Sequence, residues 1–154
     1  MRFLLGALAA LILSGTAAAQ PVNTGHIQAE LVSGAQGIAP GQSIQIALRQ
    51  RIQKGWHTYW RNAGDSGEAT KITWTMPPGW SASAFTWPTP HRLPVGPLVN
   101  YGYEGEVILP MTLTAPAGAT PGQTVTLTAK AAFLVCADIC IPEDAGLTLR
   151  LPVT

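Results

Sequence analysis

Hydrophobic and polar residues alternate along five stretches of the chain. A period of two places the apolar side chains of each stretch on one face, which is typical of a half-buried β-strand. The apolar positions are Ile44, Ile46 and Leu48; Ile72, Trp74 and Met76; Val107, Leu109, Met111 and Leu113; Val125 and Leu127; and Leu147, Leu149, Leu151 and Val153. Beyond the N-terminal segment we find no window of about 12 residues with helical periodicity, so the pattern predicts an all-β domain.

Proline and glycine turn signals separate these stretches, at residues 39–41, 76–79, 116–118 and 120–122. Such signals end one strand before the next begins. With 16 glycines and 13 prolines in 154 residues, long helices are not expected. The pattern favours an immunoglobulin-like antiparallel β-sandwich of about 7–8 strands. No repeat or linker divides the chain, so we expect one folded domain over residues 20–154.

The first 19 residues have the organisation of a secretory signal peptide. Arg2 supplies the positive start, residues 3–13 are apolar or small, and Ala17, Ala18 and Ala19 precede Gln20. The apolar run is shorter than the roughly 20 residues that a bilayer span needs. We therefore expect cleavage after Ala19 and export, with the bacterial periplasm as the favoured location.

Charge excludes one class of partner. Only 11% of residues are charged, 47% are hydrophobic, and nine Lys and Arg against eight Asp and Glu give a net charge of +1 at pH 7. Nucleic-acid binding requires a basic patch or run, and the chain has none. We expect no nucleic-acid partner.

The two cysteines, Cys136 and Cys140, carry the chemistry that the sequence offers. Their spacing permits a disulfide in an oxidising compartment. A structural staple across so short a loop contributes only about 2 kcal/mol, so a redox role is equally well supported. A third reading is a soft-metal site, in which both thiolates and His57 or His91 hold Cu(I) or Zn.

The residues around the pair disfavour a self-activated nucleophile. Asp138, Glu143 and Asp144 are negative, and the residues that flank the two cysteines are apolar. No Lys, Arg or His lies within five residues of the pair. Negative charge and an apolar environment both favour the neutral thiol over the thiolate. The pair therefore resembles a substrate for exchange more than a general oxidant.

Aromatic residues gather upstream of the cysteines, and all five tryptophans lie between Trp56 and Trp87. Most of them are expected to fill the core. In residues 54–61, alternation places Trp56 and Trp60 on one face and His57 and Tyr59 on the other, so we expect one of the two faces to be a contact surface. His26 and His91 are expected to be solvated surface residues.

Three segments in this order resemble the N-terminal periplasmic domain of the DsbD and ScsB protein-disulfide reductases. They are residues 54–60, 96–107 and 136–143, with sequences KGWHTYW, GPLVNYGYEGEV and CADICIPE. The resemblance implies an immunoglobulin-like domain that accepts two electrons from thioredoxin-like domains and a membrane-embedded disulfide reductase. It then reduces client proteins such as periplasmic disulfide isomerases. It implies no cofactor.

The resemblance also assigns roles to the cysteines. Cys140 would form the mixed disulfide with a client, and Cys136 would resolve it. Three residues separate the two cysteines here where DsbD has five, which is closer to the ScsB-like branch.

Further roles follow for the residues around the pair. His57 and Tyr59 would line the active site, with histidine replacing one of the family's aromatic residues. A mobile cap over the disulfide would lie within residues 91–103, with Leu98 and Tyr101 as its candidate shielding residues.

Two expectations concern the whole protein. No membrane segment or thioredoxin-like domain follows Thr154, so we expect either a fragment of a longer reductase or a carrier that uses a separately encoded membrane partner. The alternative function is a secreted β-sandwich binding module, with its cysteines as a structural disulfide or a copper site.

Overall fold

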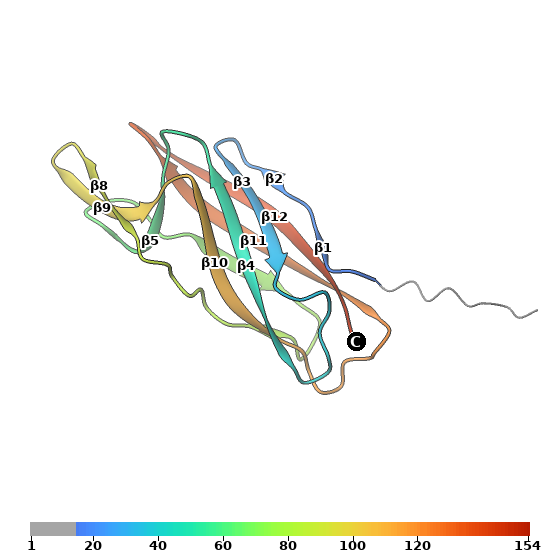
Figure 1. The fold of residues 1–154 in the computed structure, drawn as a ribbon. Coiled ribbons are helices and arrows are strands. Elements are labelled where there is room, and N and C mark those ends of the chain that lie inside the picture. Colours follow the sequence, from blue (N-terminus) through green and yellow to red (C-terminus); the bar gives the residue numbers. More distant parts are fainter. Residues whose placement is uncertain (1–14) are drawn as a thin grey trace, which may run out of the picture.

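The computed structural model describes residues 15–154, in which twelve β-strands and no helix occur (Figure 1). The strands pair in antiparallel fashion into three sheets, so the predicted all-β, immunoglobulin-like sandwich class is confirmed. The strands outnumber the expected seven or eight for two reasons. Three of them have only two residues, and the segment expected to form a loop-like cap is a hairpin.

Two sheets form the sandwich and a third extends it at one end (Figure 1). The first sheet has the order β1 (Ala18–Ala19), β12 (Cys140–Pro152), β11 (Thr124–Cys136) and β6 (Lys71–Thr75). The second has the order β2 (Val22–Asn23), β3 (Ile27–Ser33), β4 (Ser43–Ile52), β10 (Glu106–Thr114) and β7 (Ser81–Ala82). The third has the order β5 (Thr58–Gly64), β9 (Leu98–Tyr103) and β8 (His91–Val95).

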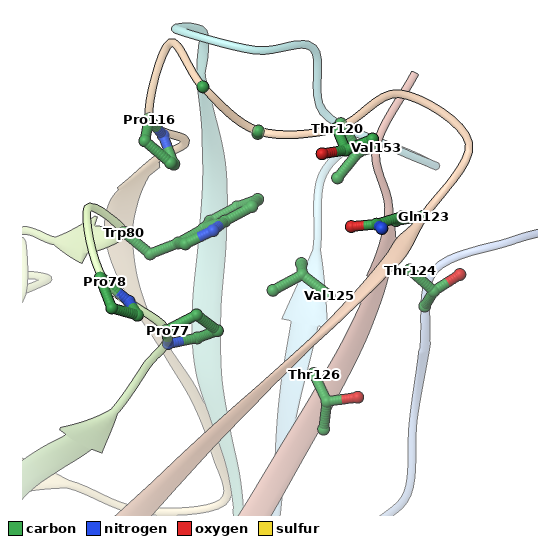
Figure 2. A pocket seen from close by; sticks show the side chains of 12 residues that line it. Pro77, Pro78, Trp80, Pro116, Thr120, Gln123, Thr124, Val125, Thr126 and Val153 are labelled. Atoms are coloured by element: carbon green, nitrogen blue, oxygen red, sulfur yellow. The ribbon is translucent and has the colours of Figure 1, made fainter.

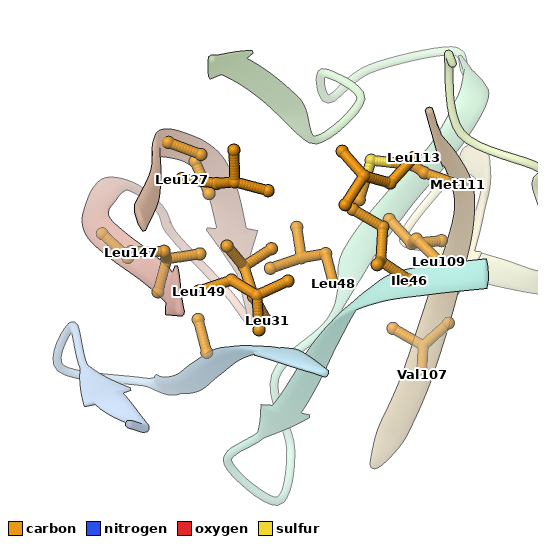
Figure 3. Packing of buried hydrophobic residues seen from close by; sticks show 14 of the residues in the cluster. Leu31, Ile46, Leu48, Val107, Leu109, Met111, Leu113, Leu127, Leu147 and Leu149 are labelled. Carbon is orange, nitrogen blue, oxygen red and sulfur yellow. The ribbon is translucent and has the colours of Figure 1, made fainter. Parts of the chain in front are cut away.

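The core lies between the first two sheets, and period-two alternation explains which side chains enter it. In β10, and in β12 from Glu143 onward, every second residue is buried, as the sequence pattern predicts. Leu48 of β4 is the register partner of Leu31 on one side and Leu109 on the other, so one leucine row crosses the second sheet. Leu127 pairs with Leu149 in the first sheet. Figure 3 shows the leucines of the two sheets packed together in the core.

The tryptophans lie at the margin of this core. All five are partly buried and pack against it. On residues 56–60, both faces are covered: Trp56 and Trp60 contact the core, while His57 and Tyr59 are buried on the opposite side. The side chains of this segment are therefore packed inside the protein and do not present the contact surface that we expected.

The N-terminal prediction falls partly outside the described residues, because the structure describes nothing before residue 15. Ala18 and Ala19 form β1 and pair with Arg150 and Leu149 of β12. Within residues 15–154, no helix is long and apolar enough to cross a membrane.

Candidate active site

A disulfide joins Cys136 and Cys140 at the tip of the β11–β12 hairpin. Cys136 ends β11, Cys140 begins β12, and the two are direct register partners with their Cα atoms 4.1 Å apart. Residues 137–139 form the connecting turn. Cys136 is 1% exposed whereas Cys140 is exposed to solvent, so Cys140 is the residue of the pair that an incoming thiolate can reach.

The backbone of His57 pairs with that of Cys136 in a short antiparallel bridge. The amide of His57 donates to the carbonyl of Cys136 at 2.9 Å, and the amide of Cys136 donates to the carbonyl of His57 at 3.0 Å. This pair of bonds attaches the start of the aromatic segment to the end of β11. It thereby places the side chains that follow beside the disulfide.

A polar chain of side chains leads from His57 to the exposed sulfur. His57 Nε2 lies 3.1 Å from the Tyr59 hydroxyl, and the two rings meet edge to face with their centroids 5.1 Å apart. The same hydroxyl lies 4.0 Å from Cys140 Sγ. The structure therefore brings His57 and Tyr59 together with the cysteine pair.

Burial determines the protonation states of the His57 and Tyr59 side chains. It lowers the pKa of His57 below 6.5, against a smaller opposing effect of the Glu104 carboxylate, so the ring is neutral at neutral pH. It also raises the pKa of Tyr59 above 10.0, so the phenol stays protonated. The Tyr59 hydroxyl is thus available as a hydrogen-bond donor to a thiolate at Cys140.

Gly67 supports the ring of Tyr59 from behind. Its φ is +92°, and a Cβ built on it would lie 2.3 Å from two ring carbons of Tyr59. Next to it, the amide of Asp65 donates to the carbonyl of Val99 at 3.0 Å, and the amide of Ser66 donates to Oδ1 of the buried Asn100 at 2.9 Å. One loop therefore holds both Tyr59 and strand β9.

The β8–β9 hairpin is the segment expected to form the cap. An open hollow of about 420 Å³ separates the end of β8 from the cysteine turn. Its lining includes residues 93–96 of the hairpin together with His57, Glu104, Ala137 and Asp138. The chain reverses after Val95, and the residues of the hairpin that line the hollow come from the end of β8 and Gly96, with none from β9.

Leu98 and Tyr101, the candidate shielding residues, do not contribute to this hollow. Both lie on β9 and are exposed, and neither lines the hollow. The ring of Tyr101 instead lies over Gly64 of β5.

A buried carboxylate near the site was missed at the sequence level. Glu143 is 8% exposed and accepts hydrogen bonds from the Thr24 hydroxyl at 2.6 Å and the His26 amide at 2.9 Å. Its other oxygen lies 2.5 Å from His26 Nδ1, and the His26 ring packs on Trp56 at 3.9 Å. The expectation that His26 is simply solvated is therefore wrong.

The balance of forces on Glu143 favours its charged form. Burial alone raises its pKa, but the hydrogen bonds from Thr24 and His26 and the charge of His26 together lower it below 4.5. The period-two pattern of β12 could have revealed the site, because it places Glu143 on the inward face with Ala145 and Leu147.

Sequence comparison identifies the family. The model of the family described as "Thiol:disulfide interchange protein DsbD, N-terminal" matches residues 28–152, which include the aromatic segment and both cysteines. The chain belongs to this family. A search of the curated proteins gives no match for the DsbD N-terminal domain described here.

A solved structure agrees with the DsbD N-terminal assignment. The N-terminal periplasmic domain of ScsB from Proteus mirabilis superposes with a TM-score of 0.66 at 26% sequence identity. The match covers 84% of this chain and 49% of that one, so the present chain spans about half of its length.

The metal reading has no complete donor set in residues 15–154. No group of three or more His, Cys, Asp or Glu side chains lies together there in a way that could hold an ion. His91, one of the two proposed histidine ligands, is exposed on β8 opposite Gly102.

A second hollow lies at the other end of this DsbD-family domain. Figure 2 shows Trp80 and several prolines lining it, beside the start of β11, whereas the disulfide lies at the end of that strand. None of its lining side chains titrates.

Proposed function

We propose that this domain carries two electrons by thiol–disulfide exchange at Cys136 and Cys140. The observation that carries the proposal is the unequal exposure of the pair, with Cys140 open to solvent and Cys136 1% exposed. Exchange requires a sulfur that a partner can attack and a second one, protected, that leaves or resolves. Membership of the DsbD N-terminal family supports the same chemistry.

Reduction of the domain proceeds in two displacements. A thiolate of a reduced dithiol donor attacks Cys140 Sγ, the bond to Cys136 breaks, and Cys136 leaves as a thiolate that takes up a proton. The second donor thiolate then attacks the first donor sulfur. This releases Cys140, which also takes up a proton, and the donor leaves as a disulfide.

Reduction of a client reverses these roles. The Cys140 thiolate attacks the client disulfide, and one client sulfur leaves and is protonated. Cys136 then loses its proton and attacks Cys140 Sγ, which restores the internal disulfide and frees the second client thiol. Two electrons and two protons pass to the client, and no cofactor is needed.

The partners follow from the same proposal. The donor is a thioredoxin-like domain of a membrane-embedded disulfide reductase, and the clients are periplasmic disulfide isomerases or other oxidised proteins. Residues 1–19 act as the signal peptide, so the mature chain begins at Gln20 in the periplasm. The periplasmic description of the ScsB domain supports this location. The mass of the exported protein tests the cleavage point.

Two single-cysteine variants test the exchange. Cys136→Ala leaves Cys140 without its resolving partner, so it should accumulate a mixed disulfide with an oxidised disulfide isomerase. Cys140→Ala leaves only the buried thiol and should form little adduct. Non-reducing electrophoresis and mass spectrometry measure both, and circular dichroism verifies that each variant is folded. Equal adduct formation would contradict the assigned roles of the two cysteines, and unfolding of Cys140→Ala would favour the structural staple.

A further inference from the structure

Ile139 stands next to the reactive sulfur and is 64% exposed. The other exposed large hydrophobic residues of the described chain, Ile108, Tyr101 and Leu98, are 42%, 37% and 40% exposed. Ile139 occupies the three-residue turn at the tip of a hairpin whose two strands have 13 residues each. Turns favour Gly, Asn, Asp and Ser, so neither packing nor turn conformation accounts for an isoleucine there.

The proposed exchange determines what must cover this side chain. In a mixed disulfide the partner sulfur lies about 2 Å from Cys140 Sγ, and the two Cβ atoms are about 4 Å apart. The neighbours of Cys140 in the turn are then inside the interface. Cys136 is 1% exposed and its backbone pairs with that of His57, so the partner reaches the disulfide at the exposed Cys140, the residue next to Ile139.

Charge further restricts the partner surface. Glu104 and Asp138 are the two carboxylates lining the hollow beside the turn, and no Lys or Arg lines it. His57, which also lines it, is neutral because burial lowers its pKa. An acidic group on the partner would be repelled at this place, whereas a neutral or basic group would be tolerated or attracted.

We propose that Ile139 is the apolar anchor by which the domain docks its thioredoxin-like redox partner. The partner surface beside the attacking cysteine is apolar and carries no acidic group next to Asp138. This inference rests on the proposed exchange function. It adds that the turn between the cysteines recognises a protein partner and does not merely connect two sulfurs.

The first experiment compares two reductants of the oxidised protein, dithiothreitol and reduced thioredoxin. Ile139→Ala should lower the second-order rate constant with thioredoxin about tenfold, which is the loss expected for about 1.4 kcal/mol of apolar contact. The dithiothreitol rate should stay unchanged, since that reagent needs no docking surface. Ile139→Leu should restore most of the thioredoxin rate. Ile108→Ala is the matched control, because it removes an exposed isoleucine from β10.

The outcomes separate the two proposals. Equal thioredoxin rates for wild type and Ile139→Ala overturn the docking anchor and leave the exchange function standing. A wild-type disulfide that dithiothreitol reduces and thioredoxin does not would reject the exchange function, and the anchor with it. A parallel loss with both reductants would also overturn the anchor, because the effect would then act on the disulfide itself.

The second experiment tests the charge requirement with two small thiols, cysteamine and 3-mercaptopropionate. Asp138→Asn should lower the ratio of the cysteamine rate to the 3-mercaptopropionate rate about twofold, as expected for removing one charge several ångströms from the reacting sulfur. Asp144→Asn, an exposed carboxylate further along β12, should leave the ratio unchanged. An unchanged ratio in Asp138→Asn overturns the charge requirement.

Discussion

The hydroxyl of Tyr59 lies 4.0 Å from Cys140 Sγ and 3.1 Å from His57 Nε2, so one phenol connects a neutral imidazole to the exposed sulfur. In the reduced domain the thiolate at Cys140 would be the nucleophile. A neutral donor at this position stabilises negative charge on sulfur without adding a charge of its own.

Tyr59→Phe should slow alkylation of Cys140 in the reduced protein. The variant keeps the ring but removes the hydrogen bond to the thiolate, which lowers the thiolate fraction at neutral pH by roughly threefold to tenfold. Iodoacetamide labelling at several pH values, followed by mass spectrometry, measures the effect. Tyr101→Phe, on the exposed side of β9, serves as the control. Identical labelling curves would remove Tyr59 from the chemistry.

His57 should make the domain less stable in mild acid. Its folded pKa lies below 6.5, so below that pH the unfolded chain binds more protons than the folded one. The free energy of unfolding therefore falls as pH drops below about 6.5. His57→Gln removes the titration and should flatten this dependence in urea unfolding. His91→Gln, which changes an exposed ring, should retain the wild-type slope.

Glu143→Gln should destabilise the fold by about 2 kcal/mol, because the buried charged acceptor for Thr24 and His26 is lost. In the wild type, the lowered pKa of Glu143 adds stability to the fold. This stability is present above pH 4.5 and is lost as the pH falls through the pKa of Glu143 in the folded protein. Denaturant titration measures both effects. Asp144→Asn removes an exposed carboxylate 3.6 Å from Lys130 and should change stability by less than about 0.5 kcal/mol.

Gly67→Ala should disturb the site through Tyr59. The new methyl group would overlap the ring, and alanine is strained at a φ of +92°. We expect the free energy of unfolding to fall by roughly 2 kcal/mol or more. Slower Cys140 alkylation should accompany it, as in Tyr59→Phe. Gly118→Ala has open space around the new Cβ and is the control. Unchanged melting and labelling of Gly67→Ala would show that the ring is free to move.

The sequence was sufficient for the sandwich because period-two alternation is a local signal. The alternation of Leu147, Leu149 and Leu151 indicates the inward face of β12 without information about its partner strand. The cysteine pair and the alternation of His57 and Tyr59 were equally visible. The resemblance to the DsbD N-terminal family then placed these residues at one site.

Other parts depend on contacts between distant segments, which a single sequence does not display. Glu143 meets Thr24 and His26 only after more than a hundred intervening residues have folded. Gly67 gains its role from the ring of Tyr59, and Leu98 and Tyr101 lie on β9 outside the lining of the hollow. The resemblance implied a mobile cap within residues 91–103, and the two short strands β8 and β9 that occupy this segment lack the longer alternating pattern that marks a strand in the sequence.

The pairing of Cys136 with Cys140 in the β11–β12 ladder bears on how fast the cycle resets. The antiparallel pairing of β11 with β12, and not the covalent bridge alone, keeps the two residues opposite one another. After reduction the sulfurs remain near neighbours, so their effective molarity toward each other stays high. A client bound through Cys140 is therefore expected to be released quickly, without a search of the chain for its own resolving thiol.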